Sequence, residues 1–250
     1  MNNLGLVSKM EVKRNTTFEG KPDTEHLNAG TISIDKGTVL TLTGKTLNNG
    51  VGIAQGTIQG NGTLDARQLT NVNPKGVINS GFLKPGDSPG ILTIDGDLTQ
   101  VDPGSLDIEL AGTAIDPLTG ITDYDRLVVT GKSELGGELH VSLIDAFLNQ
   151  PPNATDTFDI LTSDGGLGGF FTNASSYVYT TDGLGRFDVT YIAGSGSPGD
   201  AGVVRLSNFV AIPEPDAALL ILLALAGLPM VPARKSHRLA CRKPATATRS

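Results

Sequence analysis

The chain of 250 residues contains a single cysteine, no tryptophan and only 5% aromatic residues. The cysteine, Cys241, stands near the C-terminus, so the residues before it have neither a disulfide nor a cysteine-based metal site. Their stability must come from burial and backbone hydrogen bonding alone. The scarcity of large aromatic side chains is unusual for an enzyme core of this length.

Positive charge is also scarce over most of the chain. Six of the 19 Lys and Arg residues follow Asp216, after which no acid occurs, so the chain up to Asp216 holds the other 13 cations and all 26 acids. A body with this negative balance repels nucleic acid and anionic lipid. We therefore expect no nucleic-acid partner.

What the sequence does contain is 32 glycines, with short runs of Thr, Val, Ile and Leu between them, which predicts an all-β protein. The expected strands have three to five residues, too few to bury a face alone, so successive turns must stack on one another. We therefore predict a β-solenoid over residues 27–146, with residues 1–26 as its incomplete N-terminal edge. At about 20 residues per turn, it would have about six turns. The expected strands are Thr31–Ile34, Thr38–Leu42, Val51–Ala54, Thr57–Gln59, Thr63–Ala66, Val77–Asn79, Ile91–Ile94 and Leu106–Leu110.

The composition changes near Phe147, because nine of the twelve aromatic residues lie between Phe147 and Phe209. The expected strands in this part are longer and alternate more cleanly between apolar and polar residues. We predict that residues 147–210 form an antiparallel β cap that closes one end of the solenoid. Its expected strands are Phe158–Thr162, Tyr177–Thr181, Phe187–Ile192 and Val203–Leu206.

Three stretches, Gly56–Asp65, Leu83–Gln100 and Leu127–Leu143, resemble segments of autotransporter passenger domains. The string Pro-Gly-x-Ser-Pro-Gly-x-Leu-Thr at residues 85–93 is the most specific part of this resemblance. Autotransporter passengers are right-handed parallel β-helices on bacterial surfaces. The resemblance implies the same architecture for the solenoid.

The segment at residues 211–243 has three parts: Pro213-Glu214-Pro215, an apolar run at residues 217–233, and a basic stretch. The apolar run of about 17 residues would make a helix of about 26 Å, just short of a hydrocarbon core of about 30 Å. We predict one C-terminal transmembrane helix here, followed by a tail at residues 244–250. The positive-inside rule places the C-terminus in the cytoplasm and the chain up to Asp216 outside. The basic stop-transfer residues are Arg234, Lys235, Arg238, Arg242 and Lys243.

This order of parts resembles the PEP-CTERM sorting signal of Gram-negative bacteria. The resemblance implies that exosortase, a membrane-embedded cysteine protease or transpeptidase, recognises Pro213, Glu214 and Pro215. The protein would be anchored in the inner membrane during export and then released to the cell surface or the exopolysaccharide matrix. A plain membrane anchor and a buried helix are the alternatives, although a buried helix does not explain the one-sided charge.

Export also requires a secretory signal, and residues 1–20 lack an apolar core of sufficient length for one. The simplest account is that the start of the sequence is truncated or misassigned.

One pattern matches a catalytic motif. Gly86-Asp87-Ser88-Pro89-Gly90 fits the G-x-S-x-G pattern of serine hydrolases. However, Pro89 has no N–H to contribute to an oxyanion hole, and a strand is expected after Gly90 where the motif needs a helix. We expect a solenoid turn at this position.

An acidic group lies beside a basic residue at Asp116, Asp123, Asp125 and Arg126. Some β-helix proteins are polysaccharide lyases that use acidic residues to hold Ca²⁺ and a basic residue to abstract a proton. We expect a solvated loop here, with the lyase site as the alternative.

The three histidines, His26, His140 and His237, are far apart, and His237 follows the predicted membrane helix. A three-histidine metal site is therefore excluded, and His140 is expected to be an ordinary strand residue. We predict no metal and no cofactor.

Together these patterns indicate an exported, non-catalytic structural protein of the cell surface or extracellular matrix, with exosortase, the inner membrane and exopolysaccharide as expected partners. The alternatives are a lyase-like carbohydrate-active enzyme with its groove near Asp123, Asp125 and Arg126, and a sugar-binding adhesin.

Overall fold

The computed structural model describes residues 2–3, 8–71, 76–87, 89–116, 121–197 and 199–212. These residues belong to one compact unit. The predicted sorting motif, apolar helix, basic stretch and tail lie outside the described residues. Within the described part, no helix is long and apolar enough to cross a membrane.

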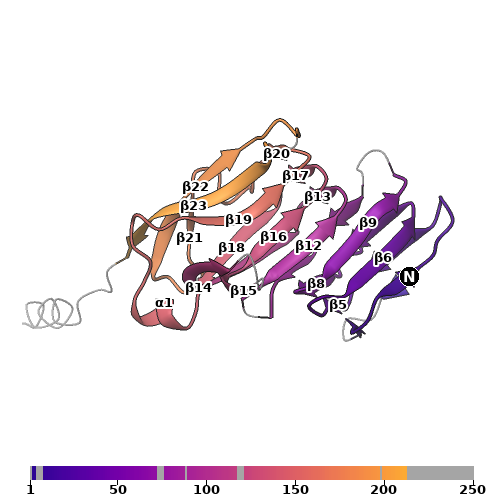
Figure 1. The fold of residues 1–250 in the computed structure, drawn as a ribbon, viewed down its shortest axis with the longest axis horizontal. Helices are drawn as coiled ribbons and strands as arrows, with labels where there is room; N and C mark the ends of the chain where they lie inside the picture. Colours follow the sequence, from indigo (N-terminus) through magenta and orange to yellow (C-terminus); the bar gives the residue numbers. More distant parts are fainter. Residues whose placement is uncertain are drawn as a thin grey trace, which may run out of the picture. The chain divides into compact units, whose positions relative to one another are not determined.

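The described chain is mostly β-strand with almost no helix, and its sheets are mainly parallel, which confirms the all-β fold class. The one α-helix in this part, α1 (Ala146–Asn149), is a single turn. The strands form three sheets, called A, B and C, and neighbouring parallel strands of a sheet are normally three strands apart in the chain (Figure 1). The chain therefore visits the three sheets in rotation, and each round stacks on the previous one.

Sheet A contains β1 (Asn2–Asn3), β4 (Glu25–Asn28), β7 (Thr46–Asn49), β10 (Val77–Asn79), β13 (Leu98–Gln100), β17 (Ser133–Leu135) and β20 (Leu167–Gly169). Sheet B contains β2 (Lys9–Val12), β5 (Thr31–Ile34), β8 (Thr57–Gly60), β11 (Phe82–Pro85), β14 (Ser105–Asp116), β15 (Ile121–Tyr124) and β18 (Glu138–Leu143). Sheet C contains β3 (Thr16–Phe18), β6 (Val39–Gly44), β9 (Thr63–Leu69), β12 (Ile91–Asp95), β16 (Arg126–Val129), β19 (Phe158–Ser163), β21 (Tyr177–Tyr179), β22 (Gly185–Ile192) and β23 (Gly202–Ala211).

The turns are longer than the sequence suggested. Thr31 pairs with Thr57, and Thr57 pairs with Phe82, so one turn covers residues 31–56 and the next covers residues 57–81. Each turn must supply a strand and a corner to all three sheets, which lengthens it beyond the expected repeat. Within the described part, residues 27–145 accordingly supply five parallel strands to sheet B, not the six turns expected. The parallel stacking also includes β2 and β3, which pair with β5 and β6.

The apolar side chains of each sheet alternate toward the interior. In sheet B the in-register pairing stacks one buried aliphatic residue from each turn directly on the next, and each has 0% exposure. Burial of such a row removes apolar surface from water along the whole stack. The row consists of Ile32, Ile58, Leu83, Leu106 and Leu139.

A second inward row, on sheet A, is polar. Asn28 Nδ2 donates to Asn49 Oδ1 at 2.7 Å, Asn49 Nδ2 donates to Asn79 Oδ1 at 2.7 Å, and Asn79 Nδ2 donates to Gln100 Oε1 at 3.1 Å. All four side chains are buried. Each amide carries a donor and an acceptor, so similar side chains in parallel register satisfy one another. We call this row the amide ladder.

At the C-terminal end of sheet C the pairing becomes antiparallel. β23 pairs antiparallel with β19, β22 with β23, and β21 with β22. The four strands expected between residues 158 and 206 are all present, and β22 and β23 extend beyond the expected bounds.

The expected strand at Val51–Ala54 was wrong. These residues form a tight reversal in which Val51 N donates to Ala54 O at 2.7 Å and Ala54 N donates to Val51 O at 3.0 Å. Gly52 has a φ of 60°, which favours glycine and turns the chain back. Ile53 projects fully into solvent, so the apolar pattern here does not mark a buried face.

Candidate functional site

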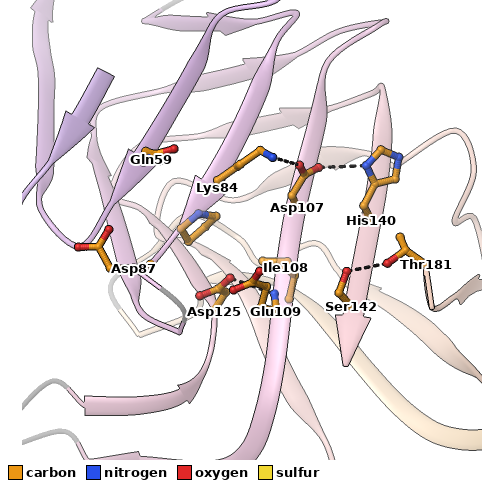
Figure 2. A pocket seen from close by; sticks show the side chains of 12 residues that line it. Gln59, Lys84, Asp87, Asp107, Ile108, Glu109, Asp125, His140, Ser142 and Thr181 are labelled. Carbon is orange, nitrogen blue, oxygen red and sulfur yellow. Dashed lines mark hydrogen bonds and ion pairs between the residues drawn. The ribbon is translucent and has the colours of Figure 1, made fainter. Parts of the chain in front are cut away.

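A groove of about 370 Å³ lies on the outer face of sheet B (Figure 2). We call it the sheet B groove. Its lining combines charged, hydroxyl and amide side chains from four parallel strands with the corner after β11 and Thr181 after β21. The lining residues are Gln59, Lys84, Pro85, Gly86, Asp87, Asp107, Ile108, Glu109, Asp125, His140, Ser142 and Thr181.

The polar side chains of the groove are aligned by the strand register. Gln59 pairs with Lys84, and Asp107 pairs with His140. Leu83 pairs with Leu106, which brings Lys84 beside Asp107. Because Leu83 and Leu106 are buried, the next residue on each strand faces outward. One row of outward polar residues therefore crosses four strands.

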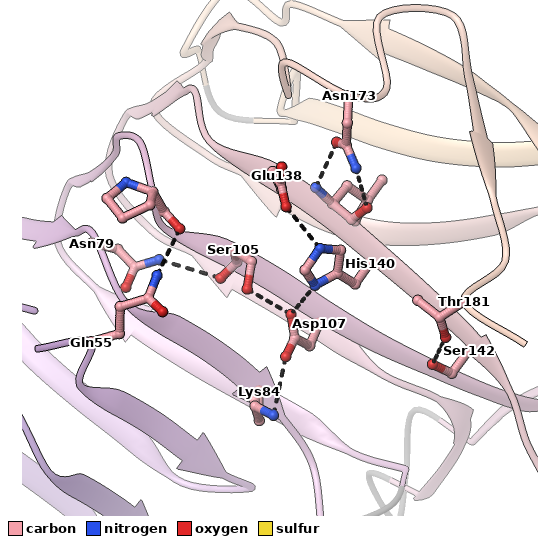
Figure 3. Close-up of polar contacts among 12 residues, drawn as sticks. Gln55, Asn79, Lys84, Ser105, Asp107, Glu138, His140, Ser142, Asn173 and Thr181 are labelled. Atoms are coloured by element: carbon pink, nitrogen blue, oxygen red, sulfur yellow. Dashed lines mark hydrogen bonds and ion pairs between the residues drawn. The ribbon is translucent and has the colours of Figure 1, made fainter. Parts of the chain in front are cut away.

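Asp107 is the centre of a hydrogen-bonded network along this row (Figure 3). Its Oδ2 lies 3.1 Å from Lys84 Nζ, and its Oδ1 accepts a 2.7 Å hydrogen bond from Ser105 Oγ. The same Oδ1 lies 3.0 Å from His140 Nδ1, while His140 Nε2 lies 3.0 Å from Glu138 Oε2. Both ring nitrogens of His140 are thus engaged by the fold.

Asp125 lies at the wall of the groove and is only 2% exposed. Its Oδ1 accepts a hydrogen bond from Gly90 N at 2.8 Å, and its Oδ2 accepts one from Glu109 N at 2.9 Å. Burial raises the pKa of Asp125 to about 8, although these two backbone hydrogen bonds oppose the shift. The expectation of a solvated loop was therefore wrong for this residue.

The glycine-rich turn after β11 is shaped by the contact with Asp125. Gly86 has a φ of 90°, and a Cβ atom at this position would collide with Asp125 Oδ1. Gly90 supplies the N–H that Asp125 accepts. The glycines that resemble a hydrolase motif thus hold a turn against a buried carboxyl group.

The other residues of the lyase alternative are also bonded within the fold. Arg126 Nε donates to Asp159 O at 3.1 Å, and Asp123 Oδ2 accepts from Ala114 N at 3.2 Å. The side chain of Asp116 lies outside the described part. Among the described residues there is no group of three or more His, Cys, Asp or Glu that could hold a metal ion.

The histidines are separate, as expected for the two that are described. His140 is a strand residue of β18, in the groove. His26 is buried on sheet A, its Nε2 lies 2.9 Å from Thr43 O, and burial lowers its pKa. His237 and the sorting residues lie outside the described residues.

Sequence reasoning did not single out Lys84, Asp107 or Glu138. Lys84, Asp107 and His140 belong to three successive turns of the stack, so they are remote from one another in the chain. Only knowledge of the unequal turn lengths would have aligned them in one row. The sequence signal that was available for these residues is that each takes an outward-facing position in a short alternating strand.

A scan against protein-family models, a search of curated proteins and a search of solved structures each found no match for the chain. The interpretation of the groove therefore depends on its own geometry.

Proposed function

We propose that the chain is an exported, non-catalytic structural protein of the bacterial cell surface or extracellular matrix. In this proposal, its body is a right-handed parallel β-helix of the autotransporter-passenger kind. The observation that supports it most is the parallel stacking from β2 to β20, with aliphatic rows and the amide ladder inside. Such a stack gives a stiff body that needs neither a cofactor nor a disulfide.

The hydrogen bonds that the candidate catalytic side chains make within the fold also favour a non-catalytic role. Asp123, Asp125 and Arg126, the residues of the lyase alternative, each form a hydrogen bond with the backbone of the fold. His140 has a carboxylate within hydrogen-bond distance of each ring nitrogen, so both nitrogens are occupied by contacts within the fold.

The sorting route is the second part of the proposal. Exosortase would read Pro213, Glu214 and Pro215, the helix at residues 217–233 would hold the protein in the inner membrane, and the following cations would stop its transfer. The support is the order of motif, apolar run and basic stretch in the sequence.

Sorting is tested by changing Pro213, Glu214 and Pro215 to alanine in a Gram-negative host that carries exosortase. The change leaves the apolar run intact, so the variant should insert but remain full-length in the inner membrane. The wild-type protein should be shortened and found outside that membrane. Identical processing of both forms would contradict the motif assignment and leave a plain membrane anchor.

The absence of lyase activity is tested separately. The wild-type protein is incubated with acidic polysaccharides and Ca²⁺, and absorbance from unsaturated products is followed. We expect none. Product formation that is lost in both Asp125→Ala and Arg126→Ala would support the lyase alternative instead.

A further inference from the structure

The sheet B groove continues onto an exposed aromatic strand. Val141 of β18 forms a parallel bridge with Thr180, and both residues are buried. Their outward neighbours must then lie side by side, which places Tyr179 next to His140 and Thr181 next to Ser142. The 2.6 Å hydrogen bond between Ser142 Oγ and Thr181 Oγ1 agrees with this register (Figure 2).

Tyr179 and Tyr177 form an aromatic platform at this end of the row. They are 56% and 44% exposed, and their ring centroids lie 5.6 Å apart at an interplanar angle of 82°. Arg186 Cζ lies 5.3 Å from the centroid of the Tyr177 ring. Tyr179 is the more exposed of the two and lies beside the polar row.

The polar row and the platform together make an elongated site. From Gln59 through Lys84, Asp107 and His140 to Tyr179 there are four steps between strands, about 19 Å at about 4.8 Å per step. Hydrogen bonds to Lys84, Ser105 and His140 hold the carboxylate of Asp107 in place, so it is ordered in advance of any ligand.

The charges of the groove limit the class of ligand that can bind there. The groove lining includes the carboxylates of Asp87, Asp107 and Glu109, and its basic groups are Lys84 and the imidazole of His140. Such a surface repels a polyanion, whether a polyuronate or a nucleic acid. The site is also the face of a sheet whose backbone groups are already paired, so it cannot bind a peptide by adding a strand.

We propose that the sheet B groove binds a neutral polysaccharide chain, with Tyr179 packing against the apolar face of one sugar ring. Sugar hydroxyl groups donate hydrogen bonds to carboxylates. They also accept hydrogen bonds from the Lys84 ammonium group and from the hydroxyls of Ser142 and Thr181. An exposed aromatic ring beside ordered polar groups supplies the apolar contact that a flat sugar ring needs.

This inference deepens the proposed surface role by naming a partner class, and it rests on that role for its biological meaning. The binding assay does not involve Pro213, Glu214 or Pro215, and the sorting assay does not involve the groove. Failure of one is therefore distinguishable from failure of the other.

The test uses the full chain in a detergent without a sugar headgroup. An array of neutral polysaccharides (glucans, galactans, mannans and chitin oligomers) and polyuronates is screened, and the best neutral hexasaccharide is then titrated by calorimetry. We expect a dissociation constant of about 1 mM or tighter, and hexagalacturonate should bind at least about tenfold more weakly.

Two variants and one control assign the binding to the groove. Tyr179→Ala and Asp107→Ala should each weaken binding about tenfold or more, which corresponds to about 1.4 kcal/mol. Phe170→Ala, which removes a 55% exposed aromatic ring at the end of sheet A, should bind like the wild type. Circular dichroism and melting curves check that each variant is folded.

The proposal is overturned if no neutral polysaccharide binds, or if hexagalacturonate binds as tightly as the neutral hexasaccharide. It is also overturned if folded Tyr179→Ala binds as well as Phe170→Ala.

Discussion

Asn49 and Asn79 bond to each other through their side chains inside the stack, where Asn49 Nδ2 donates to Asn79 Oδ1 at 2.7 Å. Both side chains have 0% exposure. A buried amide without hydrogen-bond partners lowers the free energy of unfolding. The bond therefore stabilises the fold both by its own strength and because it leaves neither amide unpaired.

The amide ladder should therefore be sensitive to loss of one member. Asn79→Ala removes bonds to both Asn49 and Gln100 and leaves buried polar atoms without partners. We expect the free energy of unfolding to fall by about 2–4 kcal/mol, measured by urea denaturation. Asn48→Ala, at a half-buried outward position on the same strand as Asn49, should change it by about 0.5 kcal/mol or less. Equal effects of the two changes would show that the ladder contributes little.

Asp125 should make stability depend on pH. Its pKa is raised by burial from 3.8 to about 8, so the folded protein holds this proton at pH values where the unfolded chain has released it. The stabilisation is complete below about pH 4 and is lost progressively as the pH rises through about 8. Its full size is on the order of 5 kcal/mol.

The measurement is the free energy of unfolding between pH 5 and pH 9, for the wild type and for Asp125→Asn. The asparagine of this variant does not ionise between pH 5 and pH 9. The variant should be less stable than the wild type at pH 5, because one of the two backbone N–H groups then faces the amide nitrogen, which cannot accept a hydrogen bond. We expect its pH profile to be flatter than that of the wild type. Parallel profiles would mean that Asp125 is ionised in the folded protein throughout this range.

Phe158 joins the cap to the stack. Its ring makes edge contacts with Tyr124, Phe147 and Phe187 at centroid distances of 5.2, 6.0 and 5.8 Å, and it is fully buried. Phe158→Ala should cost about 3–5 kcal/mol because it leaves a cavity among these rings. Phe170→Ala is the matched change at an exposed site, and its cost should be about 0.5 kcal/mol or less in the same denaturation assay. Similar melting curves for both variants would contradict a joining role for Phe158.

The apolar run should insert only while its centre stays uncharged. Changing Leu222 and Leu223 to Asp places two charges there, each at about 2.5–3.5 kcal/mol on the insertion scale, and should abolish membrane retention. Fractionation of cell membranes measures this. The matched control, Leu222→Ala with Leu223→Ala, should remain in the membrane fraction. Retention of the aspartate variant would mean that the run is not the anchor.

The sequence predicted the all-β class, and all but one of the expected strands coincide with observed strands, because short alternating runs between glycines are typical of strands. Of the seven strands of sheet A, however, only β10 was among the expected ones. Thr31–Ile34 and Val77–Asn79 match the structure residue for residue. Val51–Ala54 failed because Gly52, at positive φ, reverses the chain within an apolar run. Local pattern does not distinguish a buried strand from a corner.

The groove was harder to foresee because its members lie far apart in the chain. Lys84, Asp107 and His140 meet only when turns of different length are superposed, and no local signal gives those lengths. Asp125 was recognised as a candidate, but its burial follows from the corner around Gly86 and Gly90. The solvent exposure of a loop carboxylate depends on packing that one segment does not encode.

The hairpin of β14 and β15 contains the extra residues of one turn of the stack. Ser105 pairs with Glu138, so this turn covers residues 105–137 and is longer than the turns at residues 31–56 and 57–81. The surplus residues pair antiparallel with each other, as Ile115 does with Thr122, and the stacking of β18 on β14 keeps its register. Residues inserted between Asp116 and Ile121 should therefore leave the pairing of β14 with β18, and with it the groove, unchanged.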